Sequence, residues 1–387
     1  MVKAIKVMLI PNNVQKTKMF QYAGASRFAY NWALAREIEN YEKGGKFISD
    51  AELRKEFTKL RHSDEYAWLL NISNNVTKQA IKDACTAYKN FFKGLQKFPR
   101  FKSRKRSMPK FYQDNVKIQF SNTHVKFEGF SSSRKANKQK MNWVRLAEHG
   151  RIPTDVKYMN PRISFDGLNW WISVCVEFPD CIEKLNDDGI GIDLGIKDLA
   201  ICSDGAKYKN INKSQKVKKL EKQKRRLQRS ISRSYEKNKK GESYCKTNNV
   251  IKKEKLLLKR NHRLTNIRKN YLNQTISEIV NRKPRFICIE DLNVSGMMKN
   301  RHLSKAVQEQ GFFWFRKQLE YKCSDKGIQL IVADRFYPSS KLCSCCGNIK
   351  KDLKLSDREY RCECGNMIDR DFQASINLKG YGERFAS

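Results

Sequence analysis

The chain has 387 residues, of which 79 are Lys or Arg and 40 are Asp or Glu, so its formal net charge is +39. An excess of positive charge this large points to a polyanionic partner, and the length is enough for two or three domains. No apolar run approaches the roughly 20 residues of a membrane-spanning helix, and the N-terminus lacks a signal-peptide pattern, so nucleic acid is favoured over a membrane surface.

The first part of the chain combines one strand with a group of helices. Residues 1–10 alternate apolar and polar side chains well enough to predict a strand. Three helical patterns follow, at about 14–41, from Ser49 to about Arg61 and from near Ser73 onward. Ser49 and Glu52 have the spacing of a capping box. We expect residues 11–104 to form a helical insertion between the first two strands of a sheet.

The third of these helices has two different faces. Its apolar stripe keeps 3–4 spacing, which predicts core packing. The opposite face carries Asn75, Lys78, Gln79 and Lys82. This face is either an ordinary solvated charged surface or a surface laid against a nucleic-acid duplex, where Asn and Gln can hydrogen-bond to base edges.

Basic residues interleave with phenylalanines in the next segment, "FPRFKSRKRSMPKF" (98–111). Lys102, Arg104, Lys105 and Arg106 are its central cations. The pattern is typical of a loop that grips phosphates, and a disordered basic linker is the alternative.

Short β-like runs fill residues 116–178, with β-branched and aromatic residues between turn signals. They predict a small antiparallel barrel or sandwich that the N-terminal strand completes. Trp170 and Trp171 are expected to point to opposite faces, so that one is in the core and the other is free to stack on a base.

The second half alternates strands with helices. "GIDLG" places Asp193 on a strand, and the buried run "PRFICIED" ends in Glu290-Asp291. Between them, residues 207–283 are rich in Lys and Arg with heptad-like apolar spacing, which predicts a basic hairpin of two long helices broken near Gly241. A further helix is expected at about 308–326, followed by a strand.

Two cysteine pairs follow, Cys343-x2-Cys346 and Cys362-x-Cys364, with fifteen residues between them. Each pair ends in a glycine, which allows the tight turn that brings backbone amides toward thiolates. The spacing predicts a zinc ribbon, and Cys345 offers a spare thiolate. All twelve cysteines of the chain lack a preceding secretory signal, which favours a reducing compartment over disulfides.

Three acidic residues could bind metal together: Asp193, Glu290 and Asp371. Mg²⁺ and Mn²⁺ prefer carboxylate oxygens, and acidic clusters are costly unless a cation neutralises them. A pair of such ions hydrolyses phosphodiesters by activating water and stabilising the leaving oxygen. The five histidines form no cluster, so histidine-based catalysis has no support.

Taken together, these segments resemble a known family. "GIDLGIKDLA", "ICIEDLNVSGM" and "DRDFQASINL" are similar to the three RuvC motifs of the TnpB nucleases encoded by insertion sequences, relatives of miniature type V CRISPR effectors. "PSSKLCSCCG…REYRCECG" resembles that family's zinc ribbon, and "QYAGASRFAYNWAL" and "FFKGLQKFPRFKSRKR" resemble its N-terminal segments. The resemblance covers nearly the whole chain and is weakest at about 112–160 and 230–255.

The resemblance implies a site. Asp193, Glu290 and Asp371 would be the metal-binding catalytic residues, with Asp369 as the second choice for the third carboxylate. The chain has Gln373 where the family usually has Asn, and its Cys362-x-Cys364 knuckle is one residue shorter than the usual C-x2-C. We still expect an active site at the first departure and zinc on Cys343, Cys346, Cys362 and Cys364 at the second.

The resemblance also implies a multidomain α+β architecture: an N-terminal β-barrel with a helical insertion, then an RNase H-like (RuvC) α/β nuclease domain with inserted basic helices and a zinc ribbon. The expected boundaries are 1–10 plus 105–185 for the barrel, 11–104 for the insertion, 186–342 plus 366–387 for the nuclease domain, 207–283 for the hairpin and 343–365 for the ribbon.

The implied activity is RNA-guided cleavage of double-stranded DNA beside a short flanking motif, with Mg²⁺ or Mn²⁺, Zn²⁺ and a guide RNA as cofactors. The protein would be a monomer or homodimer in the bacterial cytoplasm, associated with the nucleoid and with no membrane partner. Two alternatives stay open: a guided repressor that does not cleave, and a RuvC-type nuclease or transposase that acts without RNA.

Overall fold

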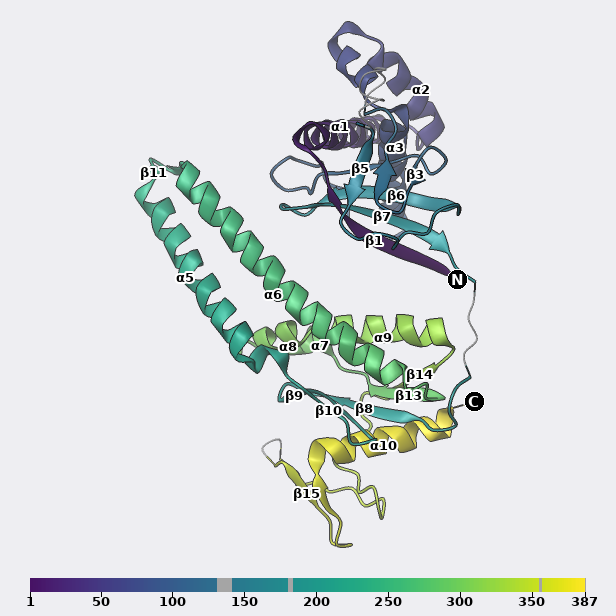
Figure 1. Cartoon of the computed structure of the whole chain (residues 1–387), viewed down its shortest axis with the longest axis vertical. Coiled ribbons are helices and arrows are strands. Elements are labelled where there is room, and N and C mark those ends of the chain that lie inside the picture. The colour runs from purple at the N-terminus through teal and green to yellow at the C-terminus, as the bar shows by residue number, and fades with distance from the viewer. Residues whose placement is uncertain (131–140, 180–183, 355–356, 387) are drawn as a thin grey trace. The chain divides into compact units, whose positions relative to one another are not determined.

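The computed structural model describes residues 1–130, 141–179, 184–354 and 357–386. The chain forms two compact units, Met1–Pro179 and Asp180–Ser387 (Figure 1). Within the described ranges, no helix has the length and apolar character needed to cross a membrane.

The first unit is built on a seven-stranded sheet. Its strands, in spatial order, are β2 (Lys110–Tyr112), β6 (Tyr158–Phe165), β7 (Trp170–Glu177), β1 (Val2–Ile10), β5 (Trp143–Leu146), β4 (His124–Lys126) and β3 (Gln119–Phe120). The N-terminal strand lies antiparallel between β7 and β5. Trp170 is buried and Trp171 is partly exposed under Lys6, which confirms that the two rings point to opposite faces.

The predicted barrel is wrong. Among the described residues no hydrogen bonds join the edge strands β2 and β3, so the sheet stays open. A layer of helices buries one face of the sheet. Its residues Met19, Tyr22, Ala80 and Ala84 share one core with the strands. With its apolar residues covered in this way, the sheet gains nothing by curling on itself.

The helical layer is the predicted insertion between β1 and β2. It contains α1 (Asn13–Glu42), α2 (Asp50–Arg61), the 3₁₀ helix η1 (Asp64–Asn71) and α3 (Asn74–Phe92). The Ser49–Glu52 capping box is confirmed, and Ser73 caps α3 through the backbone N–H of Asn75.

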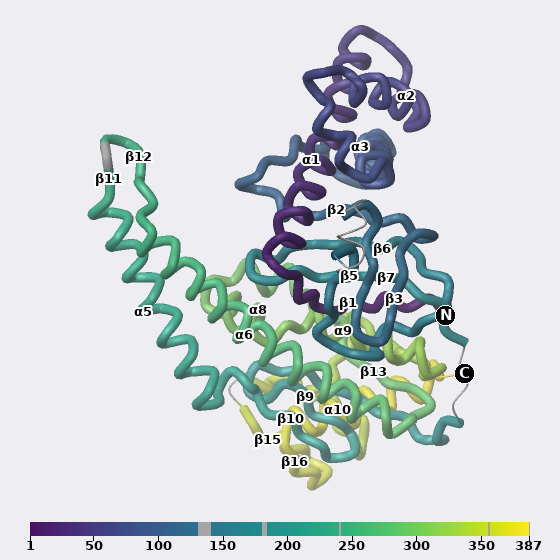
Figure 2. Tube along the Cα trace, turned by 45° about the horizontal axis from the view of Figure 1, so that its top comes forward, coloured from purple at the N-terminus to yellow at the C-terminus, as the bar shows by residue number. Residues whose placement is uncertain are grey.

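The second unit has a five-stranded sheet in the order β10 (Lys207–Lys209), β9 (Asp198–Cys202), β8 (Ile190–Leu194), β13 (Phe286–Glu290) and β14 (Gln329–Ala333). The last three strands are parallel, and β9 and β10 continue the sheet antiparallel. The long α5 (Gln215–Lys237) and α6 (Asn248–Val280) form the predicted hairpin, with a short β11 (Lys239–Lys240) and β12 (Ser243–Tyr244) at its tip (Figure 2).

Helices cover both faces of this sheet. The C-terminal part of α6 and helix α9 (Phe312–Lys326) pack on one face, and α10 (Arg370–Phe385) packs on the other (Figure 1). Gly191 of β8 allows the close approach of α10, because a Cβ there would lie 2.0 Å from the carbonyl oxygen of Ser375. Two short helices, α7 (Val294–Met297) and α8 (Ser304–Gln310), connect β13 to α9.

The helix predicted at 308–326 is broken near its start. Gly311 has φ of 70°, which ends α8 in the left-handed region before α9 begins. Apolar periodicity continues across this point, so the pattern predicted one helix where the backbone makes two. The C-terminal ribbon pairs β15 (Glu359–Arg361) with β16 (Met367–Asp369), which runs directly into α10.

Candidate active site and cysteine centre

Two of the predicted carboxylates lie side by side at the ends of parallel strands. Ile289 of β13 pairs with Ile192 of β8, so Glu290 and Asp193 come next in register. Successive side chains of a strand point to opposite faces. Because Gly191 of β8 faces α10, Asp193 faces α10 as well. Cys288 belongs to the core around α10, so Glu290 shares that side.

The third carboxylate, Asp371, lies in the first turn of α10, which begins at this edge. The neighbouring Asp369 is the N-cap of the helix and accepts from the backbone N–H groups of Asp371 and Phe372 at 3.1 and 3.0 Å. Asp369 thus has a capping role. The charges of both Asp371 and Asp369 raise the pKa of Asp193, so both carboxylates lie near it.

The charges of the three carboxylates affect the pKa values of Asp193 and Glu290. Burial raises the pKa of Asp193 well above its usual range, and the charges of Glu290 and Asp371 raise it further. Burial also raises the pKa of Glu290, although the hydroxyl of Ser339 donates to its Oε1 and partly opposes the shift. Like charges close together in a dehydrated site favour protonation or a bound cation. Their oxygen ligands fit Mg²⁺ or Mn²⁺.

Arginine side chains also reach Asp371. Arg370 lies 3.2 Å from its Oδ1 and Arg358 lies 3.8 Å from its Oδ2. In the described ranges the cysteines are the only group of three or more His, Cys, Asp or Glu close enough to share one ion, so the carboxylate oxygens are spread more widely.

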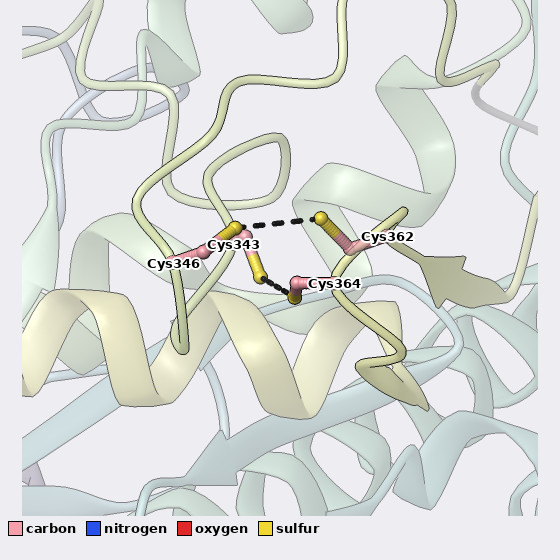
Figure 3. A group of neighbouring side chains, drawn as sticks. All are labelled: Cys343, Cys346, Cys362 and Cys364. Carbon is pink, nitrogen blue, oxygen red and sulfur yellow. Dashed lines mark hydrogen bonds between the residues drawn. The ribbon is translucent and has the colours of Figure 1, made fainter.

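The four cysteines of the ribbon converge. Their Sγ atoms all lie within 4.8 Å of one another, with Cys343–Cys364 at 3.6 Å and Cys346–Cys362 at 3.5 Å (Figure 3). A regular tetrahedron with Zn–S bonds of ~2.3 Å has S···S edges of about 3.8 Å, so the donor set fits zinc. The shortened knuckle therefore still brings both of its thiols to the cluster. Cys345 is exposed and stays outside the group.

The surroundings of Cys343 favour its thiolate form. Burial opposes ionisation of Cys343, but donors outweigh it, mainly the backbone N–H of Cys346 and the side chain of Asn366, and they lower its pKa to about 6. The amide of Asn366 donates to its Sγ at 3.4 Å. Thiolate is the form that binds metal.

Two amides of α10 fasten the ribbon to the sheet domain. Gln373, fully buried, donates to the carbonyl of Leu342 at 2.8 Å and accepts from Asn366 at 2.9 Å and from Ser344 at 3.3 Å. Asn377, one turn later, donates to the carbonyls of Ser339 and Leu342, both at 2.7 Å. Helix α10, whose first turn carries Asp371, thus also positions the cysteine loop and Ser339, the residue that donates to Glu290.

Sequence reasoning missed Ser339, Asn366 and Asn377. The i, i+4 spacing of Gln373 and Asn377 was the available signal, because two amides on one turn of an apolar helix need buried partners.

Gln373→Ala is expected to loosen this connection. Each buried partner left unsatisfied costs about 1–3 kcal/mol, so zinc should leave the ribbon faster and nuclease activity should fall. The measurement is the rate of zinc transfer to a coloured chelator, with Glu383→Ala on the exposed side of the same helix as the control. Equal rates for the two variants would contradict the role given to Gln373.

The face of α3 named in the sequence is only partly free. Asn75 donates to Glu128 at 3.1 Å and Gln79 donates to Asp83 at 2.9 Å, whereas Lys78 and Lys82 are exposed. Among the described residues, no hydrogen bond to the Oε1 atom of Gln79 is found, so this atom can still accept one.

The basic loop at 98–111 also has both packed and exposed cations. Lys102 is packed inward: its backbone exchanges two 2.8 Å hydrogen bonds with Asn31, and burial lowers its pKa to about 7. The cations that follow it, Arg104, Lys105 and Arg106, are exposed and line a cavity of about 750 Å³ against α1, together with Arg27 and Phe20. Of the four predicted loop cations, these three are exposed to solvent.

Comparison with known proteins places the chain. A family model described as "Probable transposase" matches residues 173–301, "Cas12f1-like, TNB domain" matches 312–378 and "Helix-turn-helix domain" matches 1–46. An Escherichia coli K12 protein named "Putative RNA-guided DNA endonuclease InsQ" is 30% identical over 380 residues, which cover 93% of this chain and 87% of that protein. The chain belongs to the TnpB family. A Streptomyces pristinaespiralis protein named "Putative RNA-guided DNA endonuclease" is 29% identical over 382 residues. The alignment covers 98% of this chain and 89% of that protein.

Solved structures agree on the fold. A structure titled as a Cas12f1–sgRNA–target DNA complex aligns with a TM-score of 0.61 at 12% identity, over 98% of each chain. A mini-RNA-guided endonuclease, CRISPR-Cas_phi3, aligns with a TM-score of 0.52 at 11% identity, over 98% of this TnpB-family chain and 92% of that one. At these identities the likeness concerns architecture alone.

Proposed function

We propose that this protein is an RNA-guided DNA endonuclease that hydrolyses phosphodiester bonds of target DNA at one RuvC-like site. The proposal is supported by the position of Asp193 and Glu290 on neighbouring parallel strands, with Asp371 near enough for its charge to raise the pKa of Asp193. The relatives of the chain are named as RNA-guided DNA endonucleases.

Each residue of the site has a distinct task. Asp193, Glu290 and Asp371 hold divalent cations, which supply water activation and charge stabilisation when bound. Ser339 orients Glu290 through its hydroxyl. Asp369 fixes the first turn of α10, and with it the direction of Asp371.

The cysteine centre is proposed as a structural zinc site. Four protein thiolates fill a tetrahedral shell and leave no open position for a reacting water. Its task is to hold the ribbon in one shape beside Asp371, so that a DNA strand meets an ordered surface. Gln373 and Asn377 transmit that order to α10.

The remaining basic surfaces are proposed to hold nucleic acid. In the first unit, the exposed cations of α3 and of the 104–106 loop would bind the guide RNA and the flanking duplex. The hairpin of α5 and α6 would contact the guide–target heteroduplex through its backbone, while base pairing supplies sequence.

The face of α3 gives a direct test of motif recognition. Gln79→Ala should change the flanking motif that a randomised library returns, because an amide can hydrogen-bond to base edges. Lys82→Ala should weaken binding about equally for every motif, since a cation contacts phosphates. If Gln79→Ala returned an unchanged motif, this face would be ordinary surface.

Sequencing the RNA that co-purifies with the protein tests the function as a whole. A single RNA species whose end matches DNA that the complex then cuts in the presence of Mg²⁺ is the expected result. Cleavage without RNA would favour an unguided RuvC-type nuclease or transposase. Guided binding without cleavage would favour a repressor, although three intact carboxylates argue against it.

A further inference from the structure

A second hollow opens beside the carboxylate site. It has a volume of about 310 Å³ and lies between β8, β13, the start of α7 and the first turns of α9. Glu290 is part of its wall. The hollow lies on the α9 face of the sheet and the carboxylates face α10, so a ligand here would reach the proposed point of cleavage around the ends of β8 and β13.

Its lining is apolar below and aromatic at the rim. Leu194, Ile289 and Phe312 are buried and form the apolar part. Phe313 also lines it but is 64% exposed, and no ring contact to it occurs among the described residues. An exposed phenyl ring beside an apolar hollow is a surface on which a flat ligand can stack.

Cations complete the rim. Arg316, Lys317 and Arg335 line the hollow. Asp291 holds the two guanidinium groups in place, with Arg316 at 2.7 Å and Arg335 at 2.5 Å. Fixed guanidinium groups suit phosphate. Lys317 pairs with Glu320 at 2.7 Å, so the three cations exceed their two carboxylate partners, Asp291 and Glu320, by one positive charge.

We infer that this hollow binds one nucleobase of the DNA strand being cut, stacked on Phe313, while Arg335 and Lys317 contact the adjoining phosphate. The volume is at the lower end for ligand pockets, which suits a single base and excludes a duplex. The base must therefore leave its neighbours, so the site selects single-stranded DNA. The inference rests on the proposed endonuclease function and assigns the substrate contacts of that site.

Abasic scanning tests it in the complete complex of protein, guide RNA and target. Single abasic sites are placed one at a time along the displaced strand, which does not pair with the guide, and cleavage of that strand is timed. Cleavage by the wild-type protein should slow by about 5- to 150-fold when the abasic site occupies one position near the cut. This is the factor expected from the loss of one base–aromatic stack. The Phe313→Ala variant should cleave intact DNA more slowly by a similar factor, and an abasic site at that position should slow it no further. Phe313→Trp should restore both the cleavage rate and the effect of the abasic site.

Tyr321→Ala is the matched control, because Tyr321 is an exposed aromatic residue on the same helix outside the hollow. It should keep the wild-type rate and the wild-type profile. A flat profile for a wild type that cleaves intact DNA would overturn the base site and leave the nuclease function standing. Sensitivity to abasic sites in the guide RNA instead would also overturn it. A wild type that cleaves no DNA would count against the nuclease function itself.

Discussion

Asp193→Asn should abolish target cleavage while guide RNA stays bound. The substitution keeps the size of the side chain but removes the charge that a divalent cation needs, so the cleavage rate should fall on the order of 10³-fold or more. Glu290→Gln on the neighbouring strand should behave the same way. The measurements are the cleavage rate at saturating Mg²⁺ and RNA affinity by filter binding.

The same substitution should stabilise the metal-free protein. Burial and the charges of Glu290 and Asp371 raise the pKa of Asp193, so its ionised form is unfavourable in the fold at neutral pH. Asparagine removes that repulsion, and the melting temperature without Mg²⁺ should rise by about 2–4 °C for each kcal/mol relieved. A purely structural role for Asp193 predicts the opposite sign.

Asp188→Asn is the control for both measurements. Asp188 precedes the other end of β8. Its side chain is 91% exposed, and Lys379 lies 3.5 Å from its Oδ1. This variant should cleave at the wild-type rate and melt at the wild-type temperature. Cleavage by Asp193→Asn at a rate close to that of Asp188→Asn would sink the assignment of the carboxylate site.

The positions of Asp193 and Glu290 near strand ends could be predicted from the sequence, whereas the hydrogen bonds around them could not. Asp193 and Glu290 stand at the ends of apolar runs, and such local patterns are visible in one dimension. The partners of Gln373 lie at positions 342, 344 and 366 and are brought together only by the folded ribbon. Non-local hydrogen bonds of this kind leave no periodic signal.

The errors have physical causes as well. The strands of the first unit were visible, but whether a sheet closes depends on what covers it, and α1 and α3 take that place. The break at Gly311 depends on a backbone angle that the neighbouring apolar residues do not reveal. Asn75 and Gln79 were correctly placed on one helix face. Asp83, the partner of Gln79, follows at i, i+4 spacing and was visible in the sequence, whereas Glu128, the partner of Asn75, is 53 residues away and was not.

The acidic site and the cysteine centre depend on one another through α10. Its first turn carries Asp371, and the next two turns carry Gln373 and Asn377, which hold the loops around the cysteines and Ser339. A change in the ribbon should therefore reach the carboxylates without any contact between metal sites. This coupling makes the cysteines the second place where a single substitution should have a large effect.

Cys343→Ser should remove zinc and, with it, most of the cleavage activity. Cys343 is the buried member of the cluster and the one whose pKa is lowered to about 6, so its loss removes the thiolate most ready to bind. In small cysteine sites the free energy of metal binding contributes directly to folding. The described part of the ribbon otherwise has the short β15–β16 pair and a single Leu342–Ile349 bridge. We expect loss of one equivalent of zinc by mass spectrometry, faster proteolysis within the ribbon and at least about 10-fold slower cleavage.

The neighbouring Cys345→Ser supplies the matched control, because Cys345 is exposed and lies outside the four-thiol group. It should keep one equivalent of zinc, resist protease and cleave normally. Since the two variants differ by two positions in one loop and make the same chemical change, only the geometry of the cluster separates them. Retention of zinc by Cys343→Ser, or its loss from Cys345→Ser, would show that a different set of thiols holds the metal.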